Sequence, residues 1–569
     1  MKKAVEPIRC VSRMRTAISL LLVVAACLCS QTGFAQTREL TSTDRLALLY
    51  APQLNFTREG DPLIRVGILE GRDSVKFTPD RSFRVLPIGE GGPEIELPGK
   101  VEYTAEISKS KPGKYKHLVI VDNVPVAERG RVAAVEKIWT RRGFIPETVE
   151  VGGLFAISGK VFDSRTILVG VAATEKMREA RKIKSSLESK YGVRGSIHSE
   201  AVAYPSGVIE LTGAGQKVAI RAQNVLWVAA QPGEEQEITF TVPAVPRSYG
   251  KGTETREYTG TLVFAPDKGG KLVAMVSLGA ERLLEGVVPA ETFASGPAEA
   301  LEAQAVAARN EIFAAIGVRN LADPYMLRGD VMDQVYGGTG IEDRRTSAAV
   351  KATRGKVMFY GNEIVEAYYS SNSGGHTESN ENVWDMQPRP YLRGKADAPA
   401  GKVPATFANG IAEAELGAFL DSDFPAYAKT APVSSKKHYR WNRTVDASVA
   451  EKWLRENATD VGNIRDVRIA KRGVSGRVMR LEVDGTRGKA VVERELNVRR
   501  MFGGLKSGLF LMKAEKSGDT ITRFTFHGAG FGHGVGMCQT GATGMAAAGK
   551  TADDILKHYY SGIEIRKLY

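Results

Sequence analysis

The sequence predicts an α+β fold of several domains, with many short strands and few helices. The chain has 569 residues, which corresponds to roughly three to four domains at about 100–200 residues each. Its hydrophobic content of 43% and charged content of 25% are ordinary for a globular protein with a sizeable core. Most apolar segments are short, alternate with polar residues and end at Gly or Pro, which is typical of strands.

Two regions, residues 40–112 and 206–270, are expected to be β-rich. The first contains the alternating runs LIRVGIL and VEYTAEI, and the second contains GVIELTG and YTGTLVFAP. An apolar side chain at every second position favours a strand with one buried face. We therefore predict a β-rich N-terminal region and a β-rich connecting region.

Residues 115–205 predict a different unit. HLVIVDNV is expected to be a strand and AERGRVAAVEKIWTRRG a helix, followed by the strands TVEVG, LFAISGKVFD and RTILVGVAA. The amphipathic helix EKMREARKIKSSLESKYGV and the strand GSIHSEAVAY complete a β-α-β-β-α-β order, typical of ferredoxin-like domains. The arrangement resembles a SPOR module, a family that binds peptidoglycan strands without stem peptides. The alternative is a ferredoxin-like insertion with a structural role.

The N-terminus has the layout of a secretory signal peptide, predicted at residues 1–35. Basic residues precede the apolar run AISLLLVVAACLC, and Gly33 and Ala35 offer small residues for cleavage. The run has about 13 residues, too few for a bilayer-spanning helix of roughly 20. Cys27 ends a Val-Ala-Ala-Cys sequence that resembles a lipoprotein cleavage site. We expect an exported protein of the periplasm or cell envelope, in contact with a membrane only if Cys27 is lipidated.

Cysteine and histidine usage argues against a disulfide framework and against a metal site. Cys10, Cys27 and Cys29 lie in the predicted targeting segment, so Cys538 stands alone and is expected to be a buried thiol. No HExxH sequence is present, and His and Cys residues do not cluster at metal-ligand spacing. We predict no metal and no cofactor.

The net charge of +13 and the pI near 9.3 suggest an anionic partner. A nucleic acid, an anionic surface and an acidic polymer all suit such a charge. Because the basic residues are spread along the chain without a long run, composition alone does not choose among these classes.

The stretch LEGVVPAETFASGPAEALEAQAVAARNE, residues 284–311, carries five glutamates. Pro297 suits the first turn of a helix, and Leu301 and Ile312 fall on one apolar stripe at helical spacing. The glutamates after the proline are therefore predicted to be ordinary helix residues: Glu299, Glu302 and Glu311.

Glu291 differs from these glutamates. It follows the apolar run GVVP and precedes a turn, so it can lie at a surface with apolar walls on one side. Partial desolvation there would raise the pKa of its carboxyl group, which is the condition for a general acid near neutral pH. Gln304 and Arg309 of the following helix could supply polar contacts to a ligand.

Two glycine-rich segments follow, AYYSSNSGGHTESNENVW at 367–384 and HGAGFGHGVGMCQTGATGM within 527–565. Neither has the GxxxxGK[ST] spacing of a phosphate loop, and no GxGxxG follows a clean strand. We discount nucleotide binding. Close approach of backbone to a ligand or to another strand explains the glycines better.

Several ordered motifs give the sequence a family resemblance over most of residues 255–569. The chain resembles the stage II sporulation protein D (SpoIID) family, which includes amidase-enhancer-like proteins, and we assign residues 271–569 to a SpoIID-like catalytic domain. The matching motifs are GVVPAE, Pro297–Arg309, DQVYGG, ATRGKVMFYGNEIVEAYYSSNSGGHTE, LKSGLF, GHGVGMCQTGA and HYYSGIEI. Thr292 and Gly296 depart from it, standing where the family usually has Met and Trp.

The resemblance implies a peptidoglycan lytic transglycosylase acting on strands without stem peptides. It would cleave the linkage from N-acetylmuramic acid (MurNAc) to N-acetylglucosamine (GlcNAc) and leave 1,6-anhydro-MurNAc ends, with Glu291 as the single general acid and base. The resemblance implies these further residues along the substrate cleft: Gln304, Arg309, Ser370, Gly375, His376 and His533.

The expected partners are glycan strands and a cell-wall amidase, and no nucleic acid. The alternative function is a non-catalytic wall-binding protein that enhances or recruits an N-acetylmuramoyl-L-alanine amidase. A zinc hydrolase is the third hypothesis, disfavoured because the HExxH spacing is absent.

Overall fold

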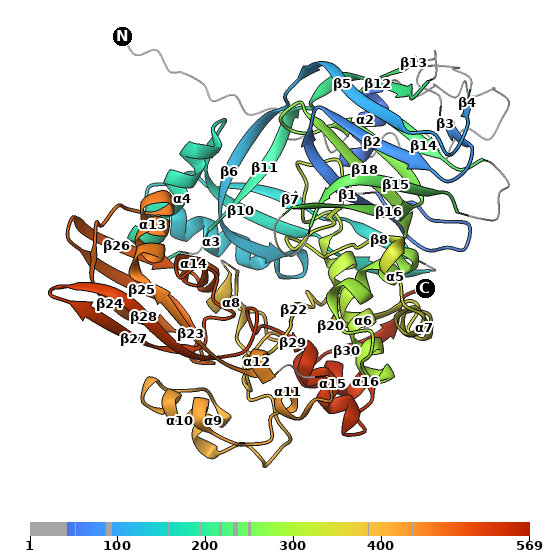
Figure 1. Cartoon of the computed structure of the whole chain (residues 1–569). Helices are drawn as coiled ribbons and strands as arrows, with labels where there is room; N and C mark the ends of the chain where they lie inside the picture. Colours follow the sequence, from blue (N-terminus) through green and yellow to red (C-terminus); the bar gives the residue numbers. More distant parts are fainter. Residues whose placement is uncertain are drawn as a thin grey trace, which may run out of the picture. The chain divides into compact units, whose positions relative to one another are not determined.

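The structure is a computed structural model (Figure 1). It describes residues 42–51, 53–86, 94–157, 159–193, 195–215, 219–231, 237–247, 252–384, 386–433 and 436–569. The predicted signal peptide and Cys27 lie outside these residues. Within the described part of the chain, no helix combines the length and apolar character needed to cross a membrane. Helices and several separate sheets confirm the predicted α+β class.

A seven-stranded sheet, in the order β19-β1-β18-β17-β14-β3-β4, forms one layer of the β-rich part. Its neighbours are antiparallel except for the parallel β1–β19 pair. The helix α2 (Ser42–Tyr50) precedes it. The strands are β1 (Leu63–Arg72), β3 (Phe83–Val85), β4 (Ile95–Leu97), β14 (Leu226–Ala229), β17 (Thr261–Pro266), β18 (Leu272–Gly279) and β19 (Leu327–Arg328).

A six-stranded sheet, in the order β13-β12-β5-β2-β15-β16, packs against the first. The Phe77 ring of β2 lies 5.5 Å from the Phe264 ring of β17, centroid to centroid, which joins the two sheets in one core. Because β5 pairs with β12, the regions 40–112 and 206–270 form a single β unit. The strands are β2 (Ser74–Pro79), β5 (Tyr103–Lys111), β12 (Ser206–Gly213), β13 (Ala219–Gln223), β15 (Thr239–Pro246) and β16 (Thr253–Thr259).

The inserted module has a sheet in the order β11-β6-β10-β7, and these four strands with α3 and α4 follow the predicted β-α-β-β-α-β order, while β8 and β9 form a separate pair between β7 and β10. LFAISGKVFD, however, is a hairpin rather than one strand, because the chain reverses at Gly159 with φ +76°. The elements are β6 (Lys114–Pro125), η1 (Val126–Glu128), α3 (Gly130–Arg141), β7 (Glu147–Val151), β8 (Leu154–Ile157), β9 (Lys160–Asp163), β10 (Thr166–Thr174), α4 (Met177–Tyr191) and β11 (Ser196–Ala203).

Both faces of the module's sheet are covered. Residues such as Val119 and Val169 pack against α3 and α4 on one face, while Leu118 and Ile120 contact Leu321 of the main body on the other. The hairpin also inserts Phe162 into the main core, 6.3 Å from the Phe313 ring. The sheet therefore offers no open face, and the module is held firmly against the rest of the chain.

The helix α6 (Ala298–Ala315) begins directly after Pro297, as predicted. It is not amphipathic, because nearly every residue is buried between two hydrophobic clusters. An alanine-rich helix without a wide polar face is typical of such a central position. Glu311 is therefore no ordinary helix glutamate: it is 4% exposed, and its Oε2 atom accepts a hydrogen bond from Arg319 at 3.1 Å.

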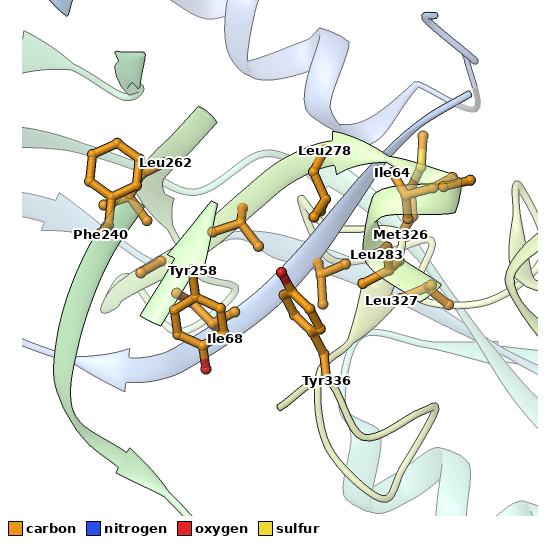
Figure 2. Packing of buried hydrophobic residues seen from close by; sticks show 14 of the residues in the cluster. Ile64, Ile68, Phe240, Tyr258, Leu262, Leu278, Leu283, Met326, Leu327 and Tyr336 are labelled. Atoms are coloured by element: carbon orange, nitrogen blue, oxygen red, sulfur yellow. The ribbon is translucent and has the colours of Figure 1, made fainter. Parts of the chain in front are cut away.

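The run before Glu291 is a helix, α5 (Ala280–Glu291), that the sequence analysis did not predict. Figure 2 shows Leu283 of this helix in the core near Ile64, Leu327 and Tyr336. Pro289 lacks an N–H donor for the last turn, and the helix ends two residues later. The buried face of α5 thus delivers Glu291 to the end of a rigid element.

The remaining elements surround α6 and continue to the C-terminus. β20, β21 and β30 form one small sheet, and β22 pairs in parallel with β29. These elements are η2 (Thr339–Ile341), α7 (Arg344–Ala352), β20 (Lys356–Tyr360), β21 (Glu363–Ile364), β22 (Tyr369–Ser370), α8 (Asn380–Val383), α9 (Ala405–Ala408), η3 (Glu413–Glu415), α10 (Leu416–Asp421), α11 (Tyr427–Thr430), α12 (Lys436–Tyr439), β29 (Met537–Cys538), α15 (Gln539–Ala547), α16 (Ala552–Tyr559) and β30 (Glu564–Lys567).

Two three-stranded sheets lie between α12 and β29 in the sequence. Their orders are β23-β28-β27 and β24-β25-β26, and they share a core with α13 and α14. The elements are β23 (Arg440–Asp446), α13 (Ala447–Asn457), β24 (Ile464–Arg472), β25 (Val478–Gly485), β26 (Gly488–Glu493), α14 (Glu495–Met501), β27 (Phe510–Ser517) and β28 (Thr520–Ala529).

Candidate active site

Glu291, the last residue of α5, is partly exposed, but its carboxyl group is desolvated by the protein around it. Burial raises the pKa of Glu291 to about 7, while the hydrogen bond from the Val335 N–H to Oε1, at 2.8 Å, acts in the opposite direction. No charged side chain of the described residues contributes to the shift. The desolvation expected from the sequence is therefore present.

An open hollow of about 640 Å³ is lined by residues that flank or bind Glu291. Ala290 and Val335, the residues beside and bonded to Glu291, line it together with Gly337. The β15–β16 hairpin also lines it, with Arg256 and the glutamates Glu254 and Glu257. The hollow is large enough for sugar units of a polymer.

Gln539 fixes the backbone of Glu291. Its Nε2 group donates to the Glu291 carbonyl at 2.7 Å and to Gln304 Oε1 at 3.3 Å. The C-terminal carbonyls of a helix have no partner inside the helix, so this bond satisfies one of them. Gln304 and Gln539 are 1% and 8% exposed, which makes the contact a buried one. The first residue of α15 therefore ties down the last residue of α5.

The loop that carries Val335 is fixed in a similar way. Gln334 Nε2 donates to the Ala308 carbonyl of α6 at 3.1 Å, and Gln334 Oε1 accepts from the Tyr369 hydroxyl at 3.1 Å. The amide that binds the Glu291 carboxyl group is thus anchored to α6. Sequence reasoning missed Gln334, Val335 and Gln539, whose contacts with Glu291 or α6 cross long stretches of chain.

Arg309 does not reach the site, which corrects the prediction that it contacts substrate. It is fully buried, and its guanidinium group forms two hydrogen bonds with Glu281 at 2.7 Å each. It also donates to the carbonyls of Val350 and Lys356. Arg309 is a structural residue that joins α6, α5 and the chain after α7.

The glycine-rich segments hold each other through the other predicted residues. Ser370 Oγ accepts a hydrogen bond from the Gly534 N–H at 3.2 Å, and β22 pairs with β29 beside it. Gly375 is buried with φ +103°, a conformation that favours glycine. His376 is 0% exposed and donates from Nδ1 to the Thr377 carbonyl at 2.7 Å. Gly375 and His376 are therefore closed to substrate, contrary to the prediction.

His533 remains partly exposed and lies 4.8 Å from the Trp384 ring. Burial lowers its pKa to about 3, so the imidazole is neutral. Its Nδ1 atom accepts from the Val535 N–H at 3.0 Å, which places the ring proton on Nε2. The histidine thus aligns the glycine-rich loop and does not exchange protons near neutral pH.

The residues around the GGHT segment do not suit a metal ion. Ser373 Oγ donates to the buried carboxylate of Asp397 at 2.6 Å. The Cys538 thiol is buried, and burial raises its pKa, so it does not form the thiolate that zinc requires. Among the described residues, no three His, Cys, Asp or Glu side chains lie close enough to hold a metal ion.

The structure defines an α+β protein in which the partly exposed Glu291 has a desolvated carboxyl group close to an open hollow. A family model described as "Stage II sporulation protein" matches residues 268–360, and a domain of unknown function matches residues 378–536. Glu291 and Val335 fall within the first of these segments, whereas Gln539 follows both.

Curated relatives extend these matches. The chain is 30% identical over 352 residues to stage II sporulation protein D of Bacillus subtilis, covering 58% of this chain and 85% of that protein. The same protein of Bacillus amyloliquefaciens is 30% identical over 308 residues, covering 50% and 73%. The amidase enhancer of Bacillus subtilis is 29% identical over 300 residues, covering 49% of this chain and 39% of that protein. The chain belongs to the stage II sporulation protein D family.

Proposed function

We propose that the protein cleaves the glycan strands of peptidoglycan as a lytic transglycosylase. The observation that carries this proposal is Glu291, whose desolvated carboxyl group has a pKa near 7 and accepts a hydrogen bond from Val335, a residue that lines an open hollow. Ordinary glycosidases use two carboxyl groups at about 5–10 Å from each other. Glu254 and Glu257 of β16 also line the hollow. We assign both the acid and the base step to Glu291, because it is the carboxyl group that Val335 and Gln539 hold in place.

The two carboxyl oxygens of Glu291 have different roles in the proposed reaction. Oε1 accepts the Val335 N–H, so in this scheme the acidic proton is on Oε2. That proton moves to the glycosidic oxygen as the bond from MurNAc C1 to this oxygen breaks. The C6 hydroxyl oxygen of the same sugar bonds to C1, and its proton returns to Glu291. No water is consumed, and the product carries a 1,6-anhydro ring.

Two physical features support this scheme. The attacking hydroxyl belongs to the same sugar, so the step gains from proximity. The Val335 N–H stabilises the carboxylate that exists after the first proton transfer. We propose that the protein is exported to the cell envelope. Its proposed substrate is glycan that carries no stem peptides. A wall amidase would then supply that substrate, and an amidase-enhancing role without catalysis is the rival function.

The test is product analysis by mass spectrometry after incubation with purified glycan strands, either free of peptides or peptide-bearing. We expect 1,6-anhydro-MurNAc ends, mainly from the peptide-free strands. Reducing MurNAc ends would indicate hydrolysis instead. No fragments from either substrate, together with stimulation of an added amidase, would establish the rival function.

The pH dependence of kcat/KM should report the pKa of Glu291. The free enzyme must hold the proton, so activity is expected to be level below pH 7 and to fall about tenfold per unit above it. An unperturbed glutamate would lose the proton near pH 4.5. A rate profile that already declines at pH 5 would contradict the assigned environment.

Gln539 should act as a positioning residue. We expect Gln539→Ala to lower kcat by about 10- to 100-fold with little change in KM, since small displacements of a catalytic group are costly. In Gln539→Glu the ionised side chain cannot donate to the Glu291 carbonyl, whereas the protonated form can. Its kcat, relative to wild type, should therefore recover at acidic pH. Equal losses at every pH, or a change in KM alone, would contradict this role.

A further inference from the structure

The two helices of the inserted module present a strongly basic outer face. α3, the adjoining Arg142 and α4 carry nine Lys or Arg residues against three glutamates. Their inner faces pack on the sheet, so the charges point outward. Six of the cations are exposed and form no ion pair with a described carboxylate: Lys137, Arg141, Arg178, Arg181, Lys182 and Lys190.

Helix stability does not account for this charge. Arg178 lies in the first turn of α4, where the macrodipole favours acidic residues, and Arg181 and Lys182 lie in the second turn, beyond that effect. Only the cations at the C-terminal ends, such as Arg141 and Lys190, would stabilise their helices. An external anionic partner explains both groups of cations.

Two large apolar side chains lie among these cations. Ile138 of α3 is 48% exposed, and Ile145, just after the helix, is 89% exposed. The segment between them is anchored, because the Phe144 ring lies 5.4 Å from the buried Trp139 ring. Exposed apolar side chains within a basic helical surface are typical of proteins that lie on anionic bilayers. A soluble wall polymer offers no apolar phase for them.

The module also lies close to the start of the described chain. Tyr50 of α2 stacks on Tyr204, which directly follows β11, with ring centroids 4.4 Å apart. The residues predicted to direct export therefore precede a helix that is attached to this module. The module's sheet is covered on both faces, which leaves the helical layer as its open surface.

We propose that the outer face of α3 and α4 docks on an anionic phospholipid membrane. The basic side chains would contact lipid phosphates, and Ile138 and Ile145 would enter the boundary between headgroups and acyl chains. This surface is separate from Glu291, so the proposal stands independently of the glycan-cleaving function. It would hold the candidate active site near a membrane even without a lipid anchor.

The test uses the chain from Ser42 onward, which forms one compact unit, and vesicles of phosphatidylglycerol with phosphatidylcholine. We expect co-sedimentation that weakens with salt and is absent with phosphatidylcholine alone. The double variant Lys137→Glu/Arg141→Glu should bind at least about thirtyfold more weakly, the value for loss of two basic residues near an anionic surface, because the new carboxylates add repulsion. Ile138→Ser/Ile145→Ser should also bind more weakly while keeping the salt dependence.

The matched control is Lys513→Glu/Lys516→Glu, which reverses two exposed charges on β27. It should bind vesicles like the parent protein. Equal binding of the α3 variant and the control would overturn the proposal. The proposal would also be overturned if the α3 variant bound vesicles normally but lost binding to peptide-free glycan, because that result assigns the face to a wall polymer.

Discussion

Replacement of Glu291 by Gln should lower the rate of glycan cleavage by about 10²- to 10⁴-fold, the usual contribution of general acid–base catalysis. The amide has the same shape, but it can neither give a proton to the glycosidic oxygen nor accept one from the C6 hydroxyl group. Substrate binding should persist, because the hollow and the Val335 amide are unchanged. The measurement is the initial rate of anhydro-ended products, with glycan binding assayed in parallel.

The matched control for this variant is Glu302→Gln. Glu302 is a partly exposed glutamate on α6, the helix that follows the Glu291 turn. We expect it to keep its activity. Equal activities of the two variants would remove Glu291 from the mechanism and favour the non-catalytic hypothesis.

Thermal unfolding of wild type and Glu291→Gln at several pH values tests whether misfolding causes the loss of activity. The folded protein holds the Glu291 proton more tightly than the unfolded chain, with a pKa near 7 against 4.5. The contribution of Glu291 to the free energy of unfolding should therefore fall as pH rises from 4.5 to 7 and should be constant below and above this interval. The variant Glu291→Gln has no titrating group at this position, so it lacks this pH-dependent loss of stability. The Tm of the variant relative to wild type should accordingly rise over that interval.

The sequence predicted the parts of the fold that depend on local pattern. Alternating apolar residues located the strands, and Pro297 located the start of α6. The hairpin in LFAISGKVFD was missed because its turn is short and its two arms alternate like a single strand. The helix α5 was missed because the apolar run with Pro289 also suits a strand or a loop.

The residues of the candidate site also divide into those that the local sequence reveals and those that it does not. Glu291 is identifiable locally, since an apolar run and a turn flank it. Gln539, in contrast, contacts a residue 248 positions away, and no local spacing reveals such a pair. The prediction that Arg309 contacts substrate was wrong because the helix around it appears from the sequence to have a polar side. In the fold this side is packed against α5 and the chain after α7, so the charge is internal.

The burial of Arg309 leads to the largest expected change in stability. Arg309→Met would leave the Glu281 carboxylate, 9% exposed, without its bidentate partner. Breaking a buried ion pair in this way costs about 3–5 kcal/mol, because the remaining charge is desolvated and uncompensated. The check is equilibrium unfolding in urea, which should show a lower midpoint with an unchanged slope.

A double variant separates this structural role from contact with substrate. Arg309→Met/Glu281→Met removes both charges and replaces the pair with apolar side chains, so it should recover most of the stability lost in the single variant. The Tyr569 hydroxyl, which bonds to Glu281, loses that partner, so the recovery should be incomplete. For the folded fraction of either variant, KM should stay close to the wild-type value. Unchanged stability with a raised KM would instead return Arg309 to the substrate cleft, because only a residue that touches the glycan would act in that way.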